Sequence, residues 1–183
     1  MDTVSFMFSL KGKSALVTGA GDASGIGFAA AKALKELGAE VFITSTSDRI
    51  YTRAEELGVK GFIADLTKES DVQALESKIS NLDILVNNAG MTSVTSPASE
   101  AEATDISQLS LEALRVGMSR NLETAFLATK YFLPKIRQSK SGRIIMISSL
   151  TGHVMAMRNQ PVYATAKAAL VGLTKSIALD EAK

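Results

Sequence analysis

The chain of 183 residues contains no cysteine, so it can form neither a disulfide bond nor a metal site with thiolate ligands. Its one histidine, His153, argues against a metal site built from histidines. An excess of either charge is also missing: there are 20 lysine and arginine residues and 19 aspartate and glutamate residues, and no basic run stands out. This balance argues against nucleic acid or an anionic membrane as the main partner.

Signals for export or membrane insertion are missing as well. The opening segment, MDTVSFMFSLKGK, has some apolar character but contains an acid at Asp2, no basic leader and no small-residue cleavage site. No apolar stretch approaches the length needed to span a bilayer. Together with 46% apolar and 21% charged residues, these features predict a soluble cytoplasmic protein.

Short apolar runs alternate with helix-favouring segments along the chain. We expect strands at 14–18, 40–44, 61–64, 83–86 and 143–147. We expect helices at 25–37, 49–57, 68–79, 109–137 and from about 161 to the end, with loops at 91–107 and after the fifth strand. Pro134 should kink or end the long helix near its last turn.

This alternation predicts the fold class. Continuous apolar strands separated by helices are typical of a buried parallel sheet with helices on both faces. Because crossovers between parallel strands are right-handed, we expect a doubly wound α/β sheet of the Rossmann type. No internal repeat or low-complexity linker interrupts the pattern, so the sequence predicts one domain over residues 1–183.

The segment TGAGDASGIG, residues 18–27, lies where the first expected strand turns into the first expected helix. A helix N-terminus presents free N–H groups and a partial positive charge. Glycines there let the backbone turn tightly and let a pyrophosphate come close, which favours a dinucleotide as the ligand. The spacing differs from the standard G-x-G-x-x-G, so a tight turn of purely structural purpose is the alternative.

Tyr163 and Lys167 are four residues apart on an expected helix and therefore share a face. Pro161 suits the first helical turn, which places both residues near the helix start. A tyrosine has a reference pKa of about 10, and a nearby lysine ammonium favours the phenolate and lowers that pKa. The pair can therefore be a tuned proton donor and acceptor. The alternative is an amphipathic tyrosine beside a solvated lysine.

Further motifs follow in a fixed order. The glycine loop precedes Asp65 after the third strand, NNAG at 87–90, Asn121, Ser149 and the Y-x-x-x-K motif. From about residue 10 to the end, this series resembles the short-chain dehydrogenase/reductase family, in its classical subfamily. Within the family it looks most similar to the 3-oxoacyl-[acyl-carrier-protein] reductase group. The resemblance implies reversible hydride transfer between nicotinamide C4 and a carbonyl or secondary alcohol carbon.

The resemblance also implies roles for individual residues. Tyr163 would be the general acid that protonates the carbonyl oxygen, and Lys167 would hold the nicotinamide ribose and lower the tyrosine pKa. Ser149 would hydrogen-bond the substrate oxygen, with Ser148 as the neighbouring candidate. Asn121 would anchor a proton-relay water. The implied catalytic set is Asn121, Ser149, Tyr163 and Lys167.

The same resemblance implies a cofactor site. Asp65 and Leu66 match a pair that contacts adenine, and residues 88–90 match the stretch that lines the cofactor ribose, whereas Asn87 has a structural role. The implied set is Gly19, Gly21, Ser24, Gly25, Ile26, Gly27, Ser45, Thr46, Arg49, Asp65, Leu66, Asn88, Ala89, Gly90, Tyr163 and Lys167.

The end of the second strand favours NADP over NAD. NAD enzymes usually place an acid here to hold the ribose 2′-hydroxyl, but the matching residue is the neutral Ser45. Thr46 and Ser47 can donate hydrogen bonds to a 2′-phosphate, and Arg49 can neutralise it. The glycine loop contains Asp22 where many NADP-preferring relatives have an arginine, so NAD stays an alternative.

A complete family member is longer, with further strands, a Pro-Gly segment near the nicotinamide and helices that close over the substrate. We therefore expect the chain to be incomplete at its C-terminus relative to the family. Residues 91–108 and 150–160 should line the substrate side, and Met155 and Met157 there suit an acyl chain. His153 can touch the substrate or be a bystander. The two helices that include residues 109–137 and 161 onward form the family's dimer interface, so we expect a homodimer or homotetramer.

Three functions stay open on the sequence alone. The first is an NADP-dependent reductase of a 3-oxoacyl thioester or a similar carbonyl. The second is a dehydrogenase or reductase of another alcohol, such as a sugar or a steroid. The third is a non-catalytic dinucleotide-binding protein, which the missing C-terminal region favours and the catalytic set opposes.

Overall fold

A computed structural model describes residues 8–90 and 104–182 of the chain. The chain divides into two compact units. The first comprises Met1–Ala89 and Leu127–Ile145, and the second comprises Gly90–Phe126 and Met146–Lys183. The expectation of one domain over residues 1–183 stays a prediction.

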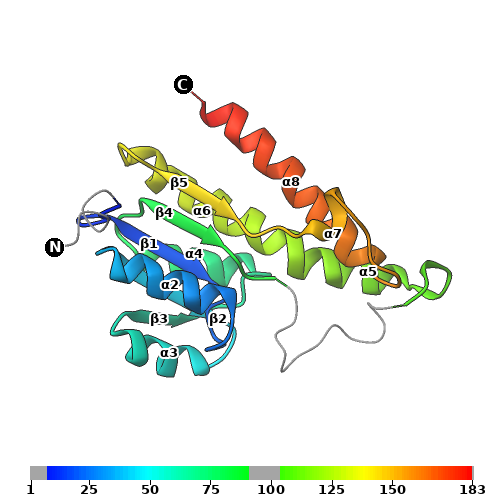
Figure 1. Cartoon of the computed structure of the whole chain (residues 1–183), viewed down its shortest axis with the longest axis horizontal. Coiled ribbons are helices and arrows are strands. Elements are labelled where there is room, and N and C mark those ends of the chain that lie inside the picture. Colours follow the sequence, from blue (N-terminus) through cyan, green and yellow to red (C-terminus); the bar gives the residue numbers. More distant parts are fainter. Residues whose placement is uncertain (1–7, 91–103, 183) are drawn as a thin grey trace. The chain divides into compact units, whose positions relative to one another are not determined.

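The first unit is built on a five-stranded sheet with the strand order β3-β2-β1-β4-β5 (Figure 1). The central strand β1 pairs in parallel with β2 and β4, and β2 pairs in parallel with β3. This order confirms the doubly wound sheet expected from the sequence. The strands span Ser14–Thr18 (β1), Glu40–Ser45 (β2), Lys60–Ile63 (β3), Ile84–Asn87 (β4) and Arg143–Met146 (β5).

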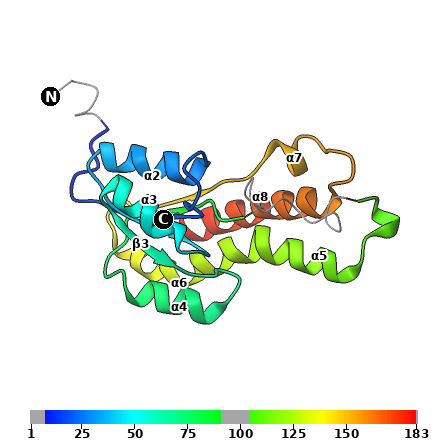
Figure 2. The same cartoon turned by 90° about the horizontal axis from the view of Figure 1, so that it is seen from below.

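Helices cover both faces of this sheet (Figure 2). One face is covered by α2 (Ile26–Glu36) and α3 (Arg49–Leu57), and the other by α4 (Glu69–Ser77) and α6 (Thr124–Gln138). The face covered by α4 and α6 includes a buried apolar cluster centred on Leu16, Leu85 and Phe132. Burial of these large side chains supplies the main driving force for folding the unit.

The long helix expected at 109–137 is divided in the structure. A 3-10 turn, η1 (Ile106–Gln108), precedes α5 (Leu111–Met118), and a π-helical segment, η2 (Ser119–Glu123), leads into α6. Pro134 was expected to kink or end the helix near its last turn, and α6 ends at Gln138. Pro134 lies one turn from that end and is exposed, so its missing N–H removes only one helical hydrogen bond.

The second unit includes a short turn, α7 (Leu150–His153), within the region expected to be a loop. Figure 2 shows α8 (Pro161–Glu181) between α5 and α7, both of which it contacts. By length and composition alone α8 is apolar enough to cross a membrane, which corrects the expectation that no stretch approaches that length. Within its unit α8 packs against α5 and α7 and buries Val162, Ala166, Lys167 and Leu170, but only 22% of its apolar span is buried.

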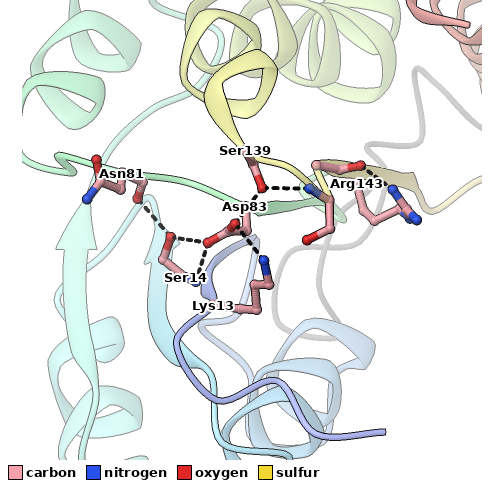
Figure 3. Close-up of polar contacts among 8 residues, drawn as sticks. Lys13, Ser14, Asn81, Asp83, Ser139 and Arg143 are labelled. Carbon is pink, nitrogen blue, oxygen red and sulfur yellow. Dashed lines mark hydrogen bonds and ion pairs between the residues drawn. The ribbon is translucent and has the colours of Figure 1, made fainter. Parts of the chain in front are cut away.

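Asp83, just before β4, joins the amino-terminal ends of the strands (Figure 3). Its carboxylate accepts hydrogen bonds from the Ser14 amide at 2.9 Å and the Ser139 hydroxyl at 2.5 Å, and pairs with Lys13 at 3.4 Å. Its carbonyl oxygen accepts from the Arg143 amide at 2.8 Å. This network fixes β1, β4 and β5 at the edge of the sheet opposite the glycine loop.

Candidate active site

The carboxyl ends of β1 and β4 form the topological switch point of the sheet, since the chain continues from β1 to one side and from β4 to the other. Ligands of open α/β sheets bind outside the strand ends at such a point. Here the Thr18 hydroxyl oxygen accepts from the amides of Asn88, at 3.0 Å, and Ala89, at 2.9 Å. Asn88 Nδ2 donates to the carbonyl oxygens of Thr18 and Gly19, both at 3.0 Å. These bonds join the two strand ends into one rigid floor.

Glycines let the first turn of α2 approach this floor. A Cβ atom added to Gly27 would lie 2.6 Å from both Asn88 Nδ2 and the Gly19 carbonyl oxygen. Gly19 itself has a φ of +70°, and a Cβ atom added to it would lie 2.8 Å from Ala89 Cα. No side chain caps α2 at Gly25, so its first N–H groups are left for a ligand. The floor and the uncapped helix start suit the pyrophosphate of a dinucleotide.

Asp22 accounts for the shape of the glycine loop. Its carboxylate accepts from the Ser24 amide at 2.9 Å, and its carbonyl oxygen accepts from the Gly25 amide at 3.0 Å. The loop is therefore closed by its own hydrogen bonds. Beyond it, Ser24 and Ile26 are exposed, as side chains that contact a cofactor must be before it binds.

The region expected to select the cofactor phosphate lies at the end of β2. A Cβ atom added to Gly21 would lie 2.9 Å from the Ser45 side chain, so Ser45 faces the glycine loop directly. The Ser45 hydroxyl donates to the Ser47 carbonyl oxygen at 3.1 Å. Arg49 donates from Nε to the Ser47 hydroxyl oxygen at 3.3 Å, and both Arg49 and Thr46 are exposed. Ser45, Thr46, Ser47 and Arg49 therefore lie in one short stretch, in which Arg49 is an exposed cation.

Asp65 and Leu66 follow β3. The Asp65 carboxylate accepts from the amide and the hydroxyl of Thr67, at 3.1 and 2.7 Å, and pairs with Lys68 at 3.3 Å. Burial raises the pKa of Asp65, but these hydrogen bonds and the lysine charge outweigh it and hold the pKa below its usual value. Leu66 is buried in the core, so a contact between Leu66 and adenine would involve its backbone.

The second unit contains the residues expected to carry out catalysis. Lys167 is buried, and its Nζ donates to the Ile147 carbonyl oxygen at 2.8 Å and lies 5.7 Å from the centre of the Tyr163 ring. Burial lowers the pKa of Lys167. A Cβ atom added to Gly90 would lie 3.3 Å from Asn121 Oδ1 and 3.7 Å from Lys167 Nζ. Gly90, Asn121, Tyr163 and Lys167 are therefore brought together.

Asn121 owes its place to the π-helical segment. Its side-chain Nδ2 donates to the Gly117 carbonyl oxygen at 3.0 Å, the group that an α-helix would pair with the amide of residue 121. Side chains that bond to nearby backbone in this way disturb regular helices. Single π-turns inside helices occur often at functional sites.

The two neighbouring serines after β5 have different partners. The Ser148 hydroxyl donates to the Lys167 carbonyl oxygen at 3.0 Å, whereas the Ser149 hydroxyl oxygen accepts from the Thr151 amide at 3.1 Å. The Ser148 proton is therefore engaged within the protein. The Ser149 proton is left for an external acceptor, which favours Ser149 over Ser148 as the substrate-binding serine.

The expected residues fall into two groups. The cofactor residues from Gly19 to Ala89 lie in the first unit, and Gly90 and the catalytic set lie in the second. On the expected substrate side, Leu150, Val154, Met155 and Met157 are exposed, as is His153, whereas residues 91–103 lie outside the described part of the chain. The sequence reasoning did not select Thr18, although it begins the glycine motif, or Gly152, which no motif marked.

Comparison with known proteins agrees with this geometry. The profile of the short chain dehydrogenase family matches residues 13–183. The chain is 36% identical over 186 residues to oxidoreductase UcpA of Salmonella typhimurium, covering 97% of this chain and 66% of that protein. It is also 36% identical over 176 residues to dehydrogenase/reductase SDR family member 6 of Aquarana catesbeiana, covering 95% and 67%. The chain thus spans about two thirds of the length of these relatives.

Solved structures show the same likeness. Ligand-free aldohexose dehydrogenase of Thermoplasma acidophilum superposes with a TM-score of 0.80 at 31% identity, over 94% of this chain and 62% of that one. A short chain dehydrogenase from Mycobacterium smegmatis superposes with a TM-score of 0.83 at 29% identity, over 94% and 72%. The profile match, the relatives and the sheet with its glycine loop agree: the chain belongs to the short-chain dehydrogenase/reductase family.

Proposed function

We propose that the protein is an NADP(H)-dependent oxidoreductase that reduces a carbonyl, of the 3-oxoacyl thioester type, to a secondary alcohol. Tyr163 is the general acid in this reaction. The reaction class follows from membership of the family, whose members take a nicotinamide dinucleotide. The substrate and the preference for the phosphorylated cofactor are inferences from the residues of this chain.

The observation that carries the proposal is the placement of Lys167. Its buried ammonium lies beside the Tyr163 ring and uses one of its three N–H donors on the Ile147 carbonyl oxygen. The other donors suit the hydroxyl groups of a ribose. An ammonium held next to a phenol also stabilises the phenolate that remains after the proton has left.

The other residues of the second unit complete the proton transfer. Ser149 donates its hydroxyl proton to the substrate carbonyl oxygen and orients it towards Tyr163 Oη, which protonates that oxygen. When bound, the cofactor supplies the hydride to the carbonyl carbon. Asn121, beside Lys167, holds a water through which the proton on Tyr163 is replaced. In the reverse direction Tyr163 accepts the proton from the alcohol.

The preference for NADP rests on the end of β2. Ser45 brings no negative charge to the region beside Gly21, and Arg49 and Thr46 are exposed in the next turn. A 2′-phosphate therefore meets one cation and several hydroxyl donors. An acid that would hold a ribose 2′-hydroxyl is missing at Ser45.

The preference for an apolar acyl substrate rests on residues 150–157. Four large apolar side chains are exposed in this segment, which follows Ser149 directly. A second candidate substrate is a sugar, favoured by the likeness to the aldohexose dehydrogenase. We further propose that the protein acts in the cytoplasm as a homodimer or homotetramer.

The test is a fluorescence titration of the chain with NADPH and NADH, followed by turnover measurements with acetoacetyl-CoA and NADPH and with an aldohexose and either oxidised cofactor. We expect tighter binding of NADPH and reduction of acetoacetyl-CoA. The Tyr163→Phe variant should bind NADPH as the parent does and lose about 100-fold or more in kcat, because general acid catalysis contributes at least that much.

The matched control is Tyr51→Phe, which removes a hydroxyl from an exposed tyrosine on α3 and should leave kcat unchanged. Turnover only with the aldohexose would establish the second candidate. Binding of nucleotide with no turnover of either substrate would contradict catalysis by this chain and leave a dinucleotide-binding protein.

A further inference from the structure

Gly152, in the α7 turn, contacts α8 without space for a side chain. Its φ of +120° and ψ of −61° are angles that other residues rarely adopt. A Cβ atom added to it would lie 2.5 Å from the Ala164 carbonyl oxygen and 2.8 Å from the Ala168 amide nitrogen. Both atoms belong to the backbone of α8, so they cannot rotate aside as the end of a flexible side chain can.

The contact lies beside the two residues that define the proposed reaction. Ala164 follows Tyr163, and Ala168 follows Lys167. An outward movement of the α7 turn would therefore increase the distance between Gly152 and the part of α8 that holds Tyr163 and Lys167.

The α7 turn is closed by hydrogen bonds and is capped by Ser149. The Gly152 amide donates to the Met155 carbonyl oxygen at 2.8 Å, and the Met155 amide donates to the Leu150 carbonyl oxygen at 3.0 Å. The Thr151 amide donates to the Ser149 hydroxyl oxygen, and the Thr151 side chain is buried. Gly152 directly follows Thr151, whose amide holds the Ser149 hydroxyl oxygen, so a shift at Gly152 moves the group that holds this hydroxyl.

Two hydrogen bonds hold the same stretch of α8 from the end of β5. The Ser148 hydroxyl donates to the Lys167 carbonyl oxygen at 3.0 Å, and Lys167 Nζ donates to the Ile147 carbonyl oxygen at 2.8 Å. Ser148 therefore bonds the backbone of Lys167, while Gly152 contacts the backbone on either side of it. Neither residue needs to touch the substrate to affect the geometry of those that do.

We propose that Gly152 is a positioning residue, assisted by Ser148, and this inference rests on the proposed function. The contact of Gly152 with the backbone of α8 sets the separation between Ser149 and the pair of Tyr163 and Lys167. The hydrogen bond from the Ser148 hydroxyl to the Lys167 carbonyl oxygen fixes the position of this part of α8 relative to Ser148 and Ser149.

The test compares Gly152→Ala with two control variants. Gly172→Ala lies on the same helix α8, and Gly12→Ala has a positive φ of +77°, but an added Cβ meets nothing within 4 Å at either position. We expect Gly152→Ala to lower kcat about 100-fold, since misplacement by about 1 Å can cost that much. The Kd for NADPH should stay within about twofold, because most of the residues that we propose for the cofactor lie in the first unit. Both controls should keep the kcat of the parent.

Ser148→Ala provides a second variant in case Gly152→Ala does not fold. It adds no atom and removes one hydrogen bond, so we expect kcat to fall about fivefold with an unchanged Kd for NADPH. Ser148→Thr, which keeps the hydroxyl, should recover the kcat of the parent. A structural role alone would lower the thermal midpoint without this division between kcat and Kd.

Parent-like kcat in both Gly152→Ala and Ser148→Ala would overturn the inference. If the parent itself turns over no carbonyl substrate, the proposed function fails, and amide hydrogen exchange of residues 163–168 then decides the inference. Faster exchange in Gly152→Ala than in Gly172→Ala would support the contact, and equal exchange would overturn it.

Discussion

The side chain of Ser45 determines the charge that lies beside the glycine loop. It ends β2 and faces Gly21 so closely that an added Cβ on the glycine would lie 2.9 Å from the serine hydroxyl oxygen. Any charge introduced at residue 45 therefore lies against the glycine loop. The neutral hydroxyl leaves Arg49 as the exposed cation of the stretch that we propose for the 2′-phosphate, next to the exposed Asp48.

The Ser45→Asp variant should reverse the cofactor preference. A carboxylate at this position repels a 2′-phosphate and accepts a hydrogen bond from a ribose 2′-hydroxyl. We expect the ratio of the Kd values for NADPH and NADH to rise about 10- to 100-fold, the range for one charged hydrogen bond. Fluorescence titration with both nucleotides measures the ratio.

Ser45→Ala is the matched control, because it removes the hydroxyl and adds no charge. Its ratio should stay close to that of the parent. A ratio that does not move in Ser45→Asp would contradict our placement of the 2′-phosphate.

The sequence predicted the site residues that can be recognised by their spacing along the chain. Tyr163 and Lys167 are four apart in a helix, so their common face follows from the helical period. The partners of Ser148 and the contact of Gly152 were not predictable, because each depends on the distance between a turn and a helix that are separate in sequence.

Helices and strands with clear local signals were predicted well. The bounds of β1 and α3 agree with the expected ranges, and Gly58 ends α3 in the left-handed conformation that glycine favours. The expected helix at 109–137 was wrong in one respect: it includes a π-helical segment at Asn121, whose bond to the Gly117 carbonyl oxygen no periodic pattern reveals.

Because Asp83 joins β1, β4 and β5, the stability of the first unit depends on pH. Burial raises the pKa of Asp83, but the hydrogen bonds from Ser139 and Ser14 and the charge of Lys13 outweigh it and lower the pKa overall. The unfolded chain therefore binds a proton at Asp83 more readily than the folded chain does. This contribution to stability is complete above the carboxyl's unfolded pKa and is lost as the pH falls through its folded pKa.

Asp83→Asn should lower the free energy of unfolding at neutral pH by about 2 kcal/mol, the range for hydrogen bonds to a charged group. The difference from the parent should shrink below about pH 4, where the parent carboxylate becomes protonated. Urea unfolding followed by circular dichroism at a series of pH values measures both effects.

The control for this series is Asp48→Asn, since Asp48 precedes α3 without a capping hydrogen bond from its side chain. Its stability difference should be small at every pH. A deficit of Asp83→Asn that is equally large at acidic and neutral pH would mean that the carboxylate charge is not the cause.

Exposed apolar side chains on three helices bear on the assembly state of the protein. Leu111, Phe126 and Leu179 are exposed on α5, α6 and α8, the helices from which we expect self-association. Contiguous apolar patches, rather than single exposed side chains, mark surfaces that bind other proteins, so this expectation rests mainly on the family. We expect sedimentation velocity at micromolar concentration to show a dimer or tetramer.

Phe126→Glu should shift this distribution towards the monomer, because association would bury the new charge. Tyr51→Glu, at a similarly exposed aromatic on α3, should leave the distribution unchanged. A monomeric parent protein would rule out the expected assembly.

The central place of β1 in the sheet has a consequence for synthesis on the ribosome. The first partner of β1, the strand β2, follows after one helix, but Ser14 and Asp83 at the starts of β1 and β4 are 69 positions apart. Closing so long a segment is slow relative to local pairing. The apolar edge of β1 therefore stays open until β4 has left the exit tunnel, and during that interval the nascent chain is most exposed to aggregation.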